Sequence, residues 1–217
     1  MEGQKSKYDE AKAVSRCIKT KKGNVYIESR LTLKSIQGLI FPPGFTSHAH
    51  YKSIYTRKET LVNSIKNGGS VAVAFLNNKT IVGYAVLDYP NTKERWAKFN
   101  GKIIMELKAI EVLREFRNCR IAQHLLIHLF SDPELERKII YLTAYSWTWD
   151  LGYLGLSVSA YKRMLTSLYA DFGFKEYQTN EPNICLKPEN FFMARVGKSV
   201  PQKIQEGFKW LRFGLKL

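Results

Sequence analysis

The order in which the apolar patterns change along the chain constrains its fold more than any other feature. Residues 70–76 and 80–89 are two β-branched apolar runs joined by Asn77-Asn78-Lys79, which is typical of a β-hairpin. A third run at residues 103–113 extends them into an antiparallel meander. Later strands alternate with helices, and a strand–helix–strand order requires a parallel pairing. We therefore predict an α/β (α+β) fold with a mixed, mostly antiparallel central sheet flanked by helices.

The remaining apolar periodicities assign the other elements. Strands are expected at residues 25–31, 138–145, 174–178 and 191–196, and helices at residues 32–39, 57–67, 157–172 and about 201–212. Another helix begins at Ile121 and is ended by Asp132-Pro133. We expect residues 1–217 to form a single domain with a polar extension over about residues 1–12.

Composition and charge restrict the classes of partner. The 217 residues are 45% hydrophobic, which is enough to bury a sizeable core. Lys and Arg number 34 against 19 Asp and Glu, and 34 − 19 gives a net charge of +15. Such an excess favours anionic partners, although a solvated basic face explains it equally well. The sequence contains no helix-turn-helix, RNP or zinc-finger pattern, so we expect no nucleic-acid partner.

Cysteine and histidine usage argues against disulfides and metal. Cys17, Cys119 and Cys185 are widely spaced and form no CxxC pair, which is typical of reduced thiols. His48 and His50 have no acidic residue at ligand spacing, so we expect no metal site. The N-terminus lacks an apolar signal region, and the longest apolar run is far short of the ~20 residues of a membrane span. We expect a soluble cytoplasmic protein without a membrane partner.

The segment at residues 106–126 carries the clearest chemical signal. Its sequence, ELKAIEVLREFRNCRIAQHLL, ends a strand, passes through a short basic turn and begins a helix. Such a junction directs backbone N–H groups and a helix N-terminus at one spot, which suits a phosphate or pyrophosphate. Arg117 and Arg120 add guanidinium groups that match phosphate oxygens. The alternative is a plain strand–helix connection whose arginines face water.

The same segment resembles a known family. The turn Arg117-Asn118-Cys119-Arg120-Ile121-Ala122 is similar to the R/Q-x-x-G-x-G/A acyl-CoA loop of the GNAT N-acetyltransferases. Ile110-Glu111-Val112 resembles the strand end before that loop, and residues 168–174 resemble the L-Y-x-x-x-G-F element, about fifty residues downstream of the loop. The resemblance implies a GNAT-like sheet and acetyl-CoA as the acetyl donor.

Six shorter stretches narrow the resemblance to the AcuA branch of that family, the acetoin-utilisation protein acetyltransferases. They occur in collinear order at residues 80–84, 94–96, 109–112, 147–151, 180–182 and 192–198. The AcuA resemblance implies acetylation of a protein lysine, namely the active-site lysine of acetyl-CoA synthetase, which acetylation switches off. A small-molecule amine acceptor and a catalytically impaired, GNAT-fold binding module remain the alternatives.

The resemblance also assigns a coenzyme site. The implied acetyl-CoA contacts are Val112, Leu113, Arg117, Asn118, Cys119, Arg120, Ile121 and Ala122. Backbone amides near Val112 and Leu113 would hold the pantetheine arm and polarise the thioester carbonyl. Family members typically carry glycine where this chain has Asn118, Arg120 and Ala122. The Arg120 side chain therefore either clamps a phosphate or obstructs the groove, and the second possibility motivates the binding-module alternative.

Three side chains are candidates for proton transfer, because a lysine amine is mostly protonated at pH 7 and needs a base. Glu106 lies eleven residues before Arg117, which matches the catalytic glutamate of histone-acetyltransferase relatives. Glu111 lies closer to the loop and, in a regular strand, on the opposite face. Either is the candidate base or a structural carboxylate. Tyr169 falls where many family members carry the tyrosine that protonates the departing thiolate, or else packs in the core.

An alternating aromatic stretch follows the strand expected at residues 138–145. Tyr145, Trp147 and Trp149 would share one face of an extended strand, since side chains alternate there. They are expected to line the channel for the amine or to pack in the core.

Overall fold

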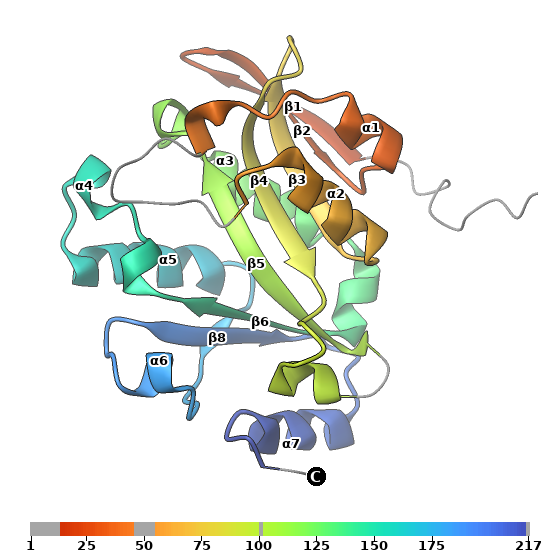
Figure 1. The fold of residues 1–217 in the computed structure, drawn as a ribbon, viewed down its shortest axis with the longest axis vertical. Helices are drawn as coiled ribbons and strands as arrows, with labels where there is room; N and C mark the ends of the chain where they lie inside the picture. Colours follow the sequence, from red (N-terminus) through yellow and green to blue (C-terminus); the bar gives the residue numbers. More distant parts are fainter. Residues whose placement is uncertain (1–13, 46–54, 100–101, 216–217) are drawn as a thin grey trace, which may run out of the picture.

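A computed structural model of the chain describes residues 14–45, 55–99 and 102–215, and its centre is one eight-stranded sheet (Figure 1). The strands follow the order β1-β2-β3-β4-β5-β6-β8-β7. They are β1 (Val14–Thr20), β2 (Gly23–Ser29), β3 (Ser70–Leu76), β4 (Ile81–Asp88), β5 (Ile104–Val112), β6 (Ile139–Ala144), β7 (Lys175–Glu176) and β8 (Phe191–Val196). Among these strands only β5 and β6 pair in parallel. The predicted mixed, mostly antiparallel sheet and the β3-β4-β5 meander are confirmed.

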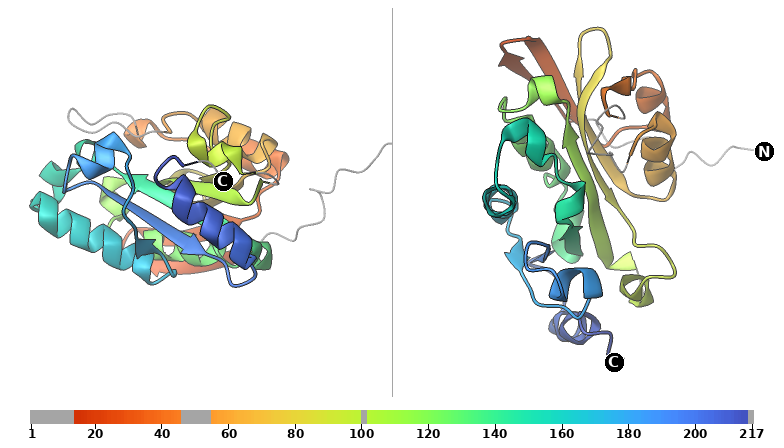
Figure 2. Two further views of the ribbon diagram at one scale, coloured as in Figure 1. Left: turned by 90° about the horizontal axis from the view of Figure 1, so that it is seen from below. Right: turned by 60° about the vertical axis from the view of Figure 1, so that its left-hand side comes forward.

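Helices cover both faces of the sheet (Figure 2). They are α1 (Leu33–Gln37), α2 (Lys58–Lys66), α3 (Ile121–Leu129), α4 (Leu151–Leu154), α5 (Val158–Ala170), α6 (Pro182–Cys185) and α7 (Gln202–Leu211). The turned view shows α1 and α2 on one face and α3, α4 and α5 on the other. The long helices agree with the sequence prediction, and Thr32 and Ser157 cap α1 and α5 through their side chains.

The centre of the sheet holds α3 close to β4. The apolar face of α3 is buried, with Ile121, Leu125, Leu126 and Leu129 in the core. Gly83 of β4 permits this approach, because a Cβ there would lie only 3.2 Å from Cγ2 of Ile121. The packing therefore fixes the N-terminus of α3 beside the end of β5.

The junction between β5 and β6 is the irregular part of the sheet. The two strands pair only from Ile104 to Glu106 against Ile139 to Tyr141. At the same level β4 and β5 shift register, because Val86 pairs with Ala109 and Leu87 pairs with Leu107. Lys108 is the extra residue, and such a β-bulge bends its strand. Beyond Glu106, β5 and β6 therefore separate and leave an opening between them.

A second aromatic cluster covers the lower part of the sheet. Trp96 lies in a short 3-10 helix, η2 (Arg95–Lys98), and stacks on Phe192 at 5.1 Å between ring centroids. Tyr141 of β6 lies 4.7 Å from Trp96 by the same measure, and Phe208 of α7 completes the cluster. The cluster anchors η2 and α7 to β6 and β8.

Three parts of the fold differ from the sequence prediction. Strand β1, Val14–Thr20, is a polar edge strand whose charged residues hid its periodicity. Strand β7 spans only Lys175–Glu176 instead of residues 174–178. The aromatic stretch after β6 is not extended, because Ser146–Thr148 forms a 3-10 turn, η6. The predicted extension at residues 1–12 lies outside the described residues.

Candidate active site

The loop between β5 and α3 adopts the backbone conformation that glycine would favour, although it contains no glycine. Asn118 has φ = 62° and Arg120 has φ = 58°, both in the left-handed region. Asparagine tolerates this region better than most residues, whereas arginine adopts it at a cost. Arg120 is also the N-cap of α3 and makes no side-chain capping hydrogen bond.

The N-terminus of α3 presents backbone donors at the end of this loop. The first-turn amides of Ile121, Ala122 and Gln123 have no acceptor within the helix, as in any α-helix. Uncapped amides and the helix dipole together favour an anion at this position. The Arg120 side chain is exposed beside them.

A groove of about 350 Å³ runs from this helix terminus towards α5. Its lining contains seven of the predicted site residues, namely Glu111, Val112, Arg117, Asn118, Arg120, Ile121 and Ala122. The opposite wall is apolar and includes Leu154, Met164 and Leu168. A groove that combines phosphate-binding groups with an apolar wall suits a long ligand with an anionic head and an apolar arm.

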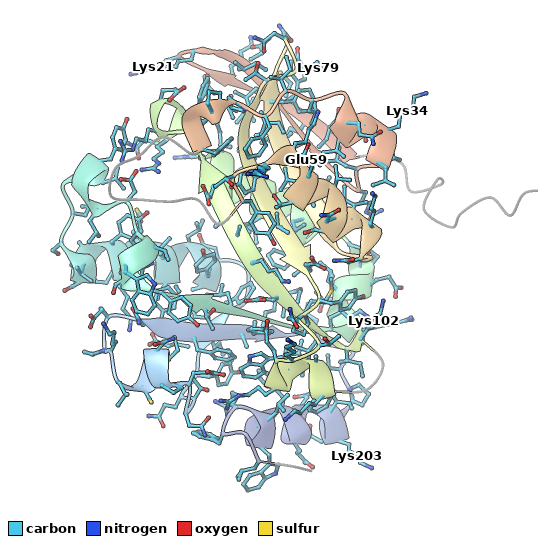
Figure 3. The ribbon with its side chains drawn as sticks, viewed as in Figure 1. Lys21, Lys34, Glu59, Lys79, Lys102 and Lys203 are labelled. Carbon is cyan, nitrogen blue, oxygen red and sulfur yellow. The ribbon has the colours of Figure 1, made fainter. Side chains whose placement is uncertain are left out.

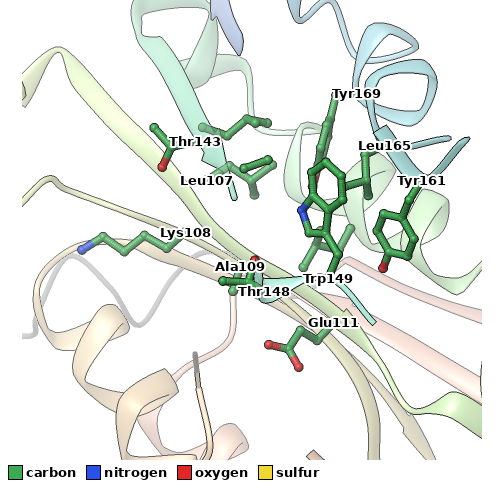
Figure 4. A pocket seen from close by; sticks show the side chains of 13 residues that line it. Leu107, Lys108, Ala109, Glu111, Thr143, Thr148, Trp149, Tyr161, Leu165 and Tyr169 are labelled. Atoms are coloured by element: carbon green, nitrogen blue, oxygen red, sulfur yellow. The ribbon is translucent and has the colours of Figure 1, made fainter. Parts of the chain in front are cut away.

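Where β5 and β6 separate, a smaller cavity of about 120 Å³ continues the groove (Figure 4). Ile110, Glu111, Tyr161 and Leu165 line both spaces. Figure 4 shows Trp149, Tyr161 and Tyr169 on one side of the cavity and Lys108 directed away from them. The two spaces therefore form one path from the α3 N-terminus into the sheet.

A buried ion-pair cluster joins the loop to the segment after β6. The Asp150 carboxylate, whose side chain is 4% exposed, accepts hydrogen bonds from Arg114 at 2.6 and 2.7 Å and from Arg117 at 2.7 Å. Although burial opposes ionisation, these hydrogen bonds hold the pKa of Asp150 below its ordinary value. The Tyr153 ring lies against both guanidinium groups. Asp150 thus fixes the orientation of Arg117, which also donates to the Val112 carbonyl at 3.3 Å.

Sequence reasoning missed this role of Asp150. Asp150 belongs to the stretch at residues 147–151 that resembles AcuA, but nothing in that stretch indicates which distant side chains it meets. Its partner Arg114 lies in a 3-10 turn, η4 (Arg114–Phe116), that the periodicity did not reveal.

Two predicted coenzyme contacts lie away from the groove. Leu113 is buried, and its amide donates to the Val82 carbonyl at 2.9 Å, so that amide is already engaged in the sheet. The expectation that the Leu113 amide holds a ligand needs correction for this reason. Cys119 does not line the groove, because its half-buried side chain packs against the main core.

The two candidate bases have different surroundings. Glu111 lines the groove and the cavity, close to Tyr161. Glu106 lies at the last paired position before β5 and β6 separate, opposite Tyr141. Burial, and secondarily the negative charge of Glu94, raises the pKa of Glu106 to about 7. A carboxyl group that titrates near neutral pH suits general-base catalysis.

Tyr169 is one of the residues that line the cavity. It is buried, burial raises the pKa of its hydroxyl, and the group therefore stays protonated at neutral pH. Of the three aromatic residues after β6, only Trp149 lines the cavity, where it stacks on Tyr161 at 5.3 Å between ring centroids. Tyr145 and Trp147 stack on each other instead, and Trp147 is 51% exposed. The expectation of one shared face is wrong because η6 interrupts the strand.

The lysines labelled in Figure 3 lie far apart on the outline of the molecule. Lys21 and Lys79 mark one end, Lys34 and Lys102 lie along one side, and Lys203 marks the other end. These lysines therefore do not form a single cluster.

Within residues 14–45, 55–99 and 102–215, no group of three or more His, Cys, Asp or Glu side chains is arranged to hold a metal ion. His48 and His50 lie outside the described residues. None of the helices that the structure describes is long and apolar enough to cross a membrane.

Comparison with known proteins identifies close relatives over most of the chain. No family model matches it. The chain is 32% identical over 196 residues to the acetoin utilization protein AcuA of Bacillus subtilis strain 168, covering 90% of this chain and 92% of that protein. It is 33% identical over 198 residues to the AcuA of Bacillus licheniformis, with the same coverage. The crystal structure of an acetoin utilization protein from Exiguobacterium sibiricum 255-15 superposes with a TM-score of 0.85 at 33% identity, covering 93% of this chain and 94% of that one.

Proposed function

Because the chain belongs to the AcuA branch of the GNAT N-acetyltransferase superfamily, we propose that it transfers the acetyl group of acetyl-CoA to the amine of a protein lysine. The observation that carries this proposal is the continuous path from the bare N-terminus of α3 to the opening between β5 and β6. An anionic head group fits the first end, and a reactive thioester fits the second.

The groove supplies suitable contacts for the coenzyme. The amides of Ile121 and Ala122 would donate hydrogen bonds to the pyrophosphate at the helix terminus, with Arg117 and Arg120 beside them. The apolar wall formed by α5 would contact the pantetheine arm. Of the amides near the end of β5, that of Val112 is the one proposed to bind this arm, since that of Leu113 donates to Val82.

Glu106 is the proposed general base. A deprotonated lysine amine attacks the thioester carbonyl directly, forming the amide bond and releasing the coenzyme thiolate. Glu106 accepts the amine proton, and its pKa of about 7 leaves a large fraction ionised at neutral pH. Glu111 is the competing candidate because it lines the cavity itself.

Tyr169 is the proposed donor to the departing thiolate. Its position in the lining of the cavity and its raised pKa support a protonated hydroxyl there. Its packing against Phe174 at 6.0 Å between ring centroids also gives it a structural role. A Tyr169→Phe variant separates the two roles, since the ring is retained and only the hydroxyl is lost.

The proposed protein substrate is acetyl-CoA synthetase, in which acetylation of the active-site lysine switches the enzyme off. This assignment rests on membership of the AcuA branch. Family membership also gives the expected setting, which is acetoin and acetate metabolism in the cytoplasm. A small-molecule amine is the competing acceptor.

The backbone of the coenzyme loop favours a catalyst over an impaired binding module. The concern raised by the sequence is the loss of glycine at positions 118 and 120. Both residues nevertheless adopt positive φ, so the loop keeps the geometry for which glycine is used. The first residues of α3, Ile121 and Ala122, also line the groove.

The test is acetyl-CoA-dependent transfer, followed by thiol release and by mass spectrometry of acetyl-CoA synthetase. Glu106→Gln is expected to lower kcat by about 10²–10⁴-fold and to leave acetyl-CoA affinity unchanged. Higher pH should partly restore the rate, since free amine becomes more abundant. Glu111→Gln tests the competing candidate in the same way, and only the variant of the true base should show this rescue by pH. Wild-type rates in both variants would refute the assignment of the base, and absence of transfer by the wild-type chain would refute the proposed function.

A further inference from the structure

A group of ionisable side chains surrounds Glu106 where β5 and β6 separate. We call it the vertex cluster, and it consists of Asp88 at the end of β4, Glu94 before η2, Glu106 and Lys108 of β5, and Tyr141 of β6. Three carboxyl groups in one place are notable in a chain with a net charge of +15. Lys108 pairs with Asp88 at 3.9 Å, which leaves Glu94 and Glu106 to share Tyr141.

Tyr141 lies between these two carboxyl groups. Its hydroxyl donates to Oε2 of Glu94 at 3.1 Å. The same hydroxyl interacts with Glu106, whose strand position is directly opposite Tyr141 in the parallel register. Tyr141 is 1% exposed, whereas Glu94 is half-buried at the molecular surface. The three groups therefore form a chain that begins at the candidate base and ends near solvent.

We propose that Tyr141 and Glu94 relay the proton that Glu106 takes from the acceptor amine to solvent. This inference rests on the proposed function, in which Glu106 is the base. Tyr141 and Glu94 act through Glu106 and are therefore positioning residues in the reaction.

The relay balances without any further reactant. After proton abstraction, the protonated Glu106 carboxyl donates its proton to the Tyr141 oxygen. Tyr141 simultaneously gives its own hydroxyl proton to the Glu94 carboxylate and is again a neutral phenol. Glu94 then releases the proton to water, and Glu106 is again a carboxylate. The hydroxyl never needs to ionise, which agrees with the strong upward shift that burial imposes on the pKa of Tyr141.

The charges around Glu106 determine how a substitution of each neighbour shifts the pKa of Glu106. Asp88 and Glu94 disfavour its ionisation, whereas Lys108 and the Tyr141 hydroxyl favour it. Besides burial, the negative charges of Asp88 and Glu106 also raise the pKa of Tyr55, which precedes α2. Removing the Tyr141 hydroxyl should therefore raise the apparent pKa of the base, and neutralising Glu94 should lower it.

Tyr141→Phe and Glu94→Gln test the relay. Phenylalanine keeps the ring that packs against Trp96 and Phe192, so the fold should be preserved. Both variants are expected to lower the pH-independent plateau of kcat by at least about tenfold, while their apparent pKa values move in opposite directions. Imidazole added as an external proton acceptor should partly restore the plateau rate in Tyr141→Phe. Acetyl-CoA affinity should stay at the wild-type value.

Tyr177→Phe is the matched control, because Tyr177 packs against Phe208 in the same aromatic cluster but not against Glu106. It should leave both the plateau and the apparent pKa unchanged. If Tyr141→Phe and Glu94→Gln shift only the apparent pKa and keep the plateau rate, Glu106 exchanges its proton with solvent directly and the relay is wrong. If the wild-type chain transfers no acetyl group, the proposed function itself fails.

Discussion

Replacing Arg120 by glycine should move stability and coenzyme affinity in opposite directions. Arg120 has φ = 58°, caps α3 without a side-chain hydrogen bond, and lines the groove beside the α3 amides. Its backbone conformation suits glycine, whereas its charge suits phosphate. The two roles can be separated because stability depends mainly on the first and affinity on the second.

The gain in stability follows from the backbone. A side chain in the left-handed region costs about 1–2 kcal/mol. Glycine offsets this gain by roughly 0.5–1 kcal/mol, because it gives the unfolded chain greater conformational freedom. The net gain is therefore between about 0 and 1.5 kcal/mol, which for a chain of this size corresponds to a rise in Tm of up to about 6 °C.

The loss of affinity follows from the charge. A hydrogen bond between charged groups contributes about 1.5–3 kcal/mol, but exposed ion pairs contribute only about 0.2–1 kcal/mol. Because Arg120 is exposed, the smaller range applies. We expect Arg120→Gly to weaken acetyl-CoA binding by up to about fivefold at low salt, and by less at high salt.

Calorimetry with acetyl-CoA and thermal unfolding measure the two effects on the same protein. Asn118→Gly is the control, because Asn118 shares the positive φ without the charge. It should raise Tm less, since asparagine tolerates this conformation, and should leave affinity unchanged. Tighter binding by Arg120→Gly would mean that Arg120 obstructs the groove. Unchanged binding would mean that its side chain points to solvent. Either result would refute a contact between Arg120 and a phosphate of the coenzyme.

Three further predictions concern Arg117, Asp150 and Glu106. Arg117→Ala should weaken acetyl-CoA binding by about tenfold to a hundredfold in calorimetry, and an unchanged constant would refute a phosphate contact. Asp150→Ala should lower the free energy of unfolding in urea by about 3 kcal/mol, because it leaves the guanidinium groups of Arg114 and Arg117 without their buried partner. Glu106 binds its proton more tightly in the folded chain, with a pKa of about 7 against 4.5, so its contribution to stability falls as pH rises through that window. Glu106→Gln should therefore gain stability relative to wild type between pH 5 and pH 8 in urea unfolding, and a constant difference would refute the raised pKa.

The sequence was sufficient to predict those helices and strands that bury at least one apolar face, because burial leaves a periodic apolar pattern. The β3-β4 hairpin and the helices α3 and α5 follow from local periodicity. Strand β1 was not predicted because it is an edge strand with exposed Arg16 and Lys19. Such strands carry no strong apolar alternation.

The site was predictable only where it is contiguous in sequence. Seven of the predicted residues line one groove because they belong to a single strand–turn–helix segment. The Asp150 ion pairs and the Tyr141–Glu94 hydrogen bond join residues 33 to 47 positions apart, and no local pattern encodes such contacts. The bulge at Lys108 also lies beyond sequence periodicity, since it depends on the register between β4 and β5.

The bulge and the separated strands give the two sides of β5 opposite electrostatic character. The groove side carries Arg117, Arg120 and the N-terminus of α3, all of which favour an anion. The vertex cluster carries three carboxyl groups with Lys108 as the counter-charge. A chain with a net charge of +15 would not gather these carboxyl groups by composition alone. Their separation suits a reaction in which an anionic acetyl donor and a cationic amine approach the same opening from different sides, and it keeps the proposed base, Glu106, away from the guanidinium groups that would lower its pKa.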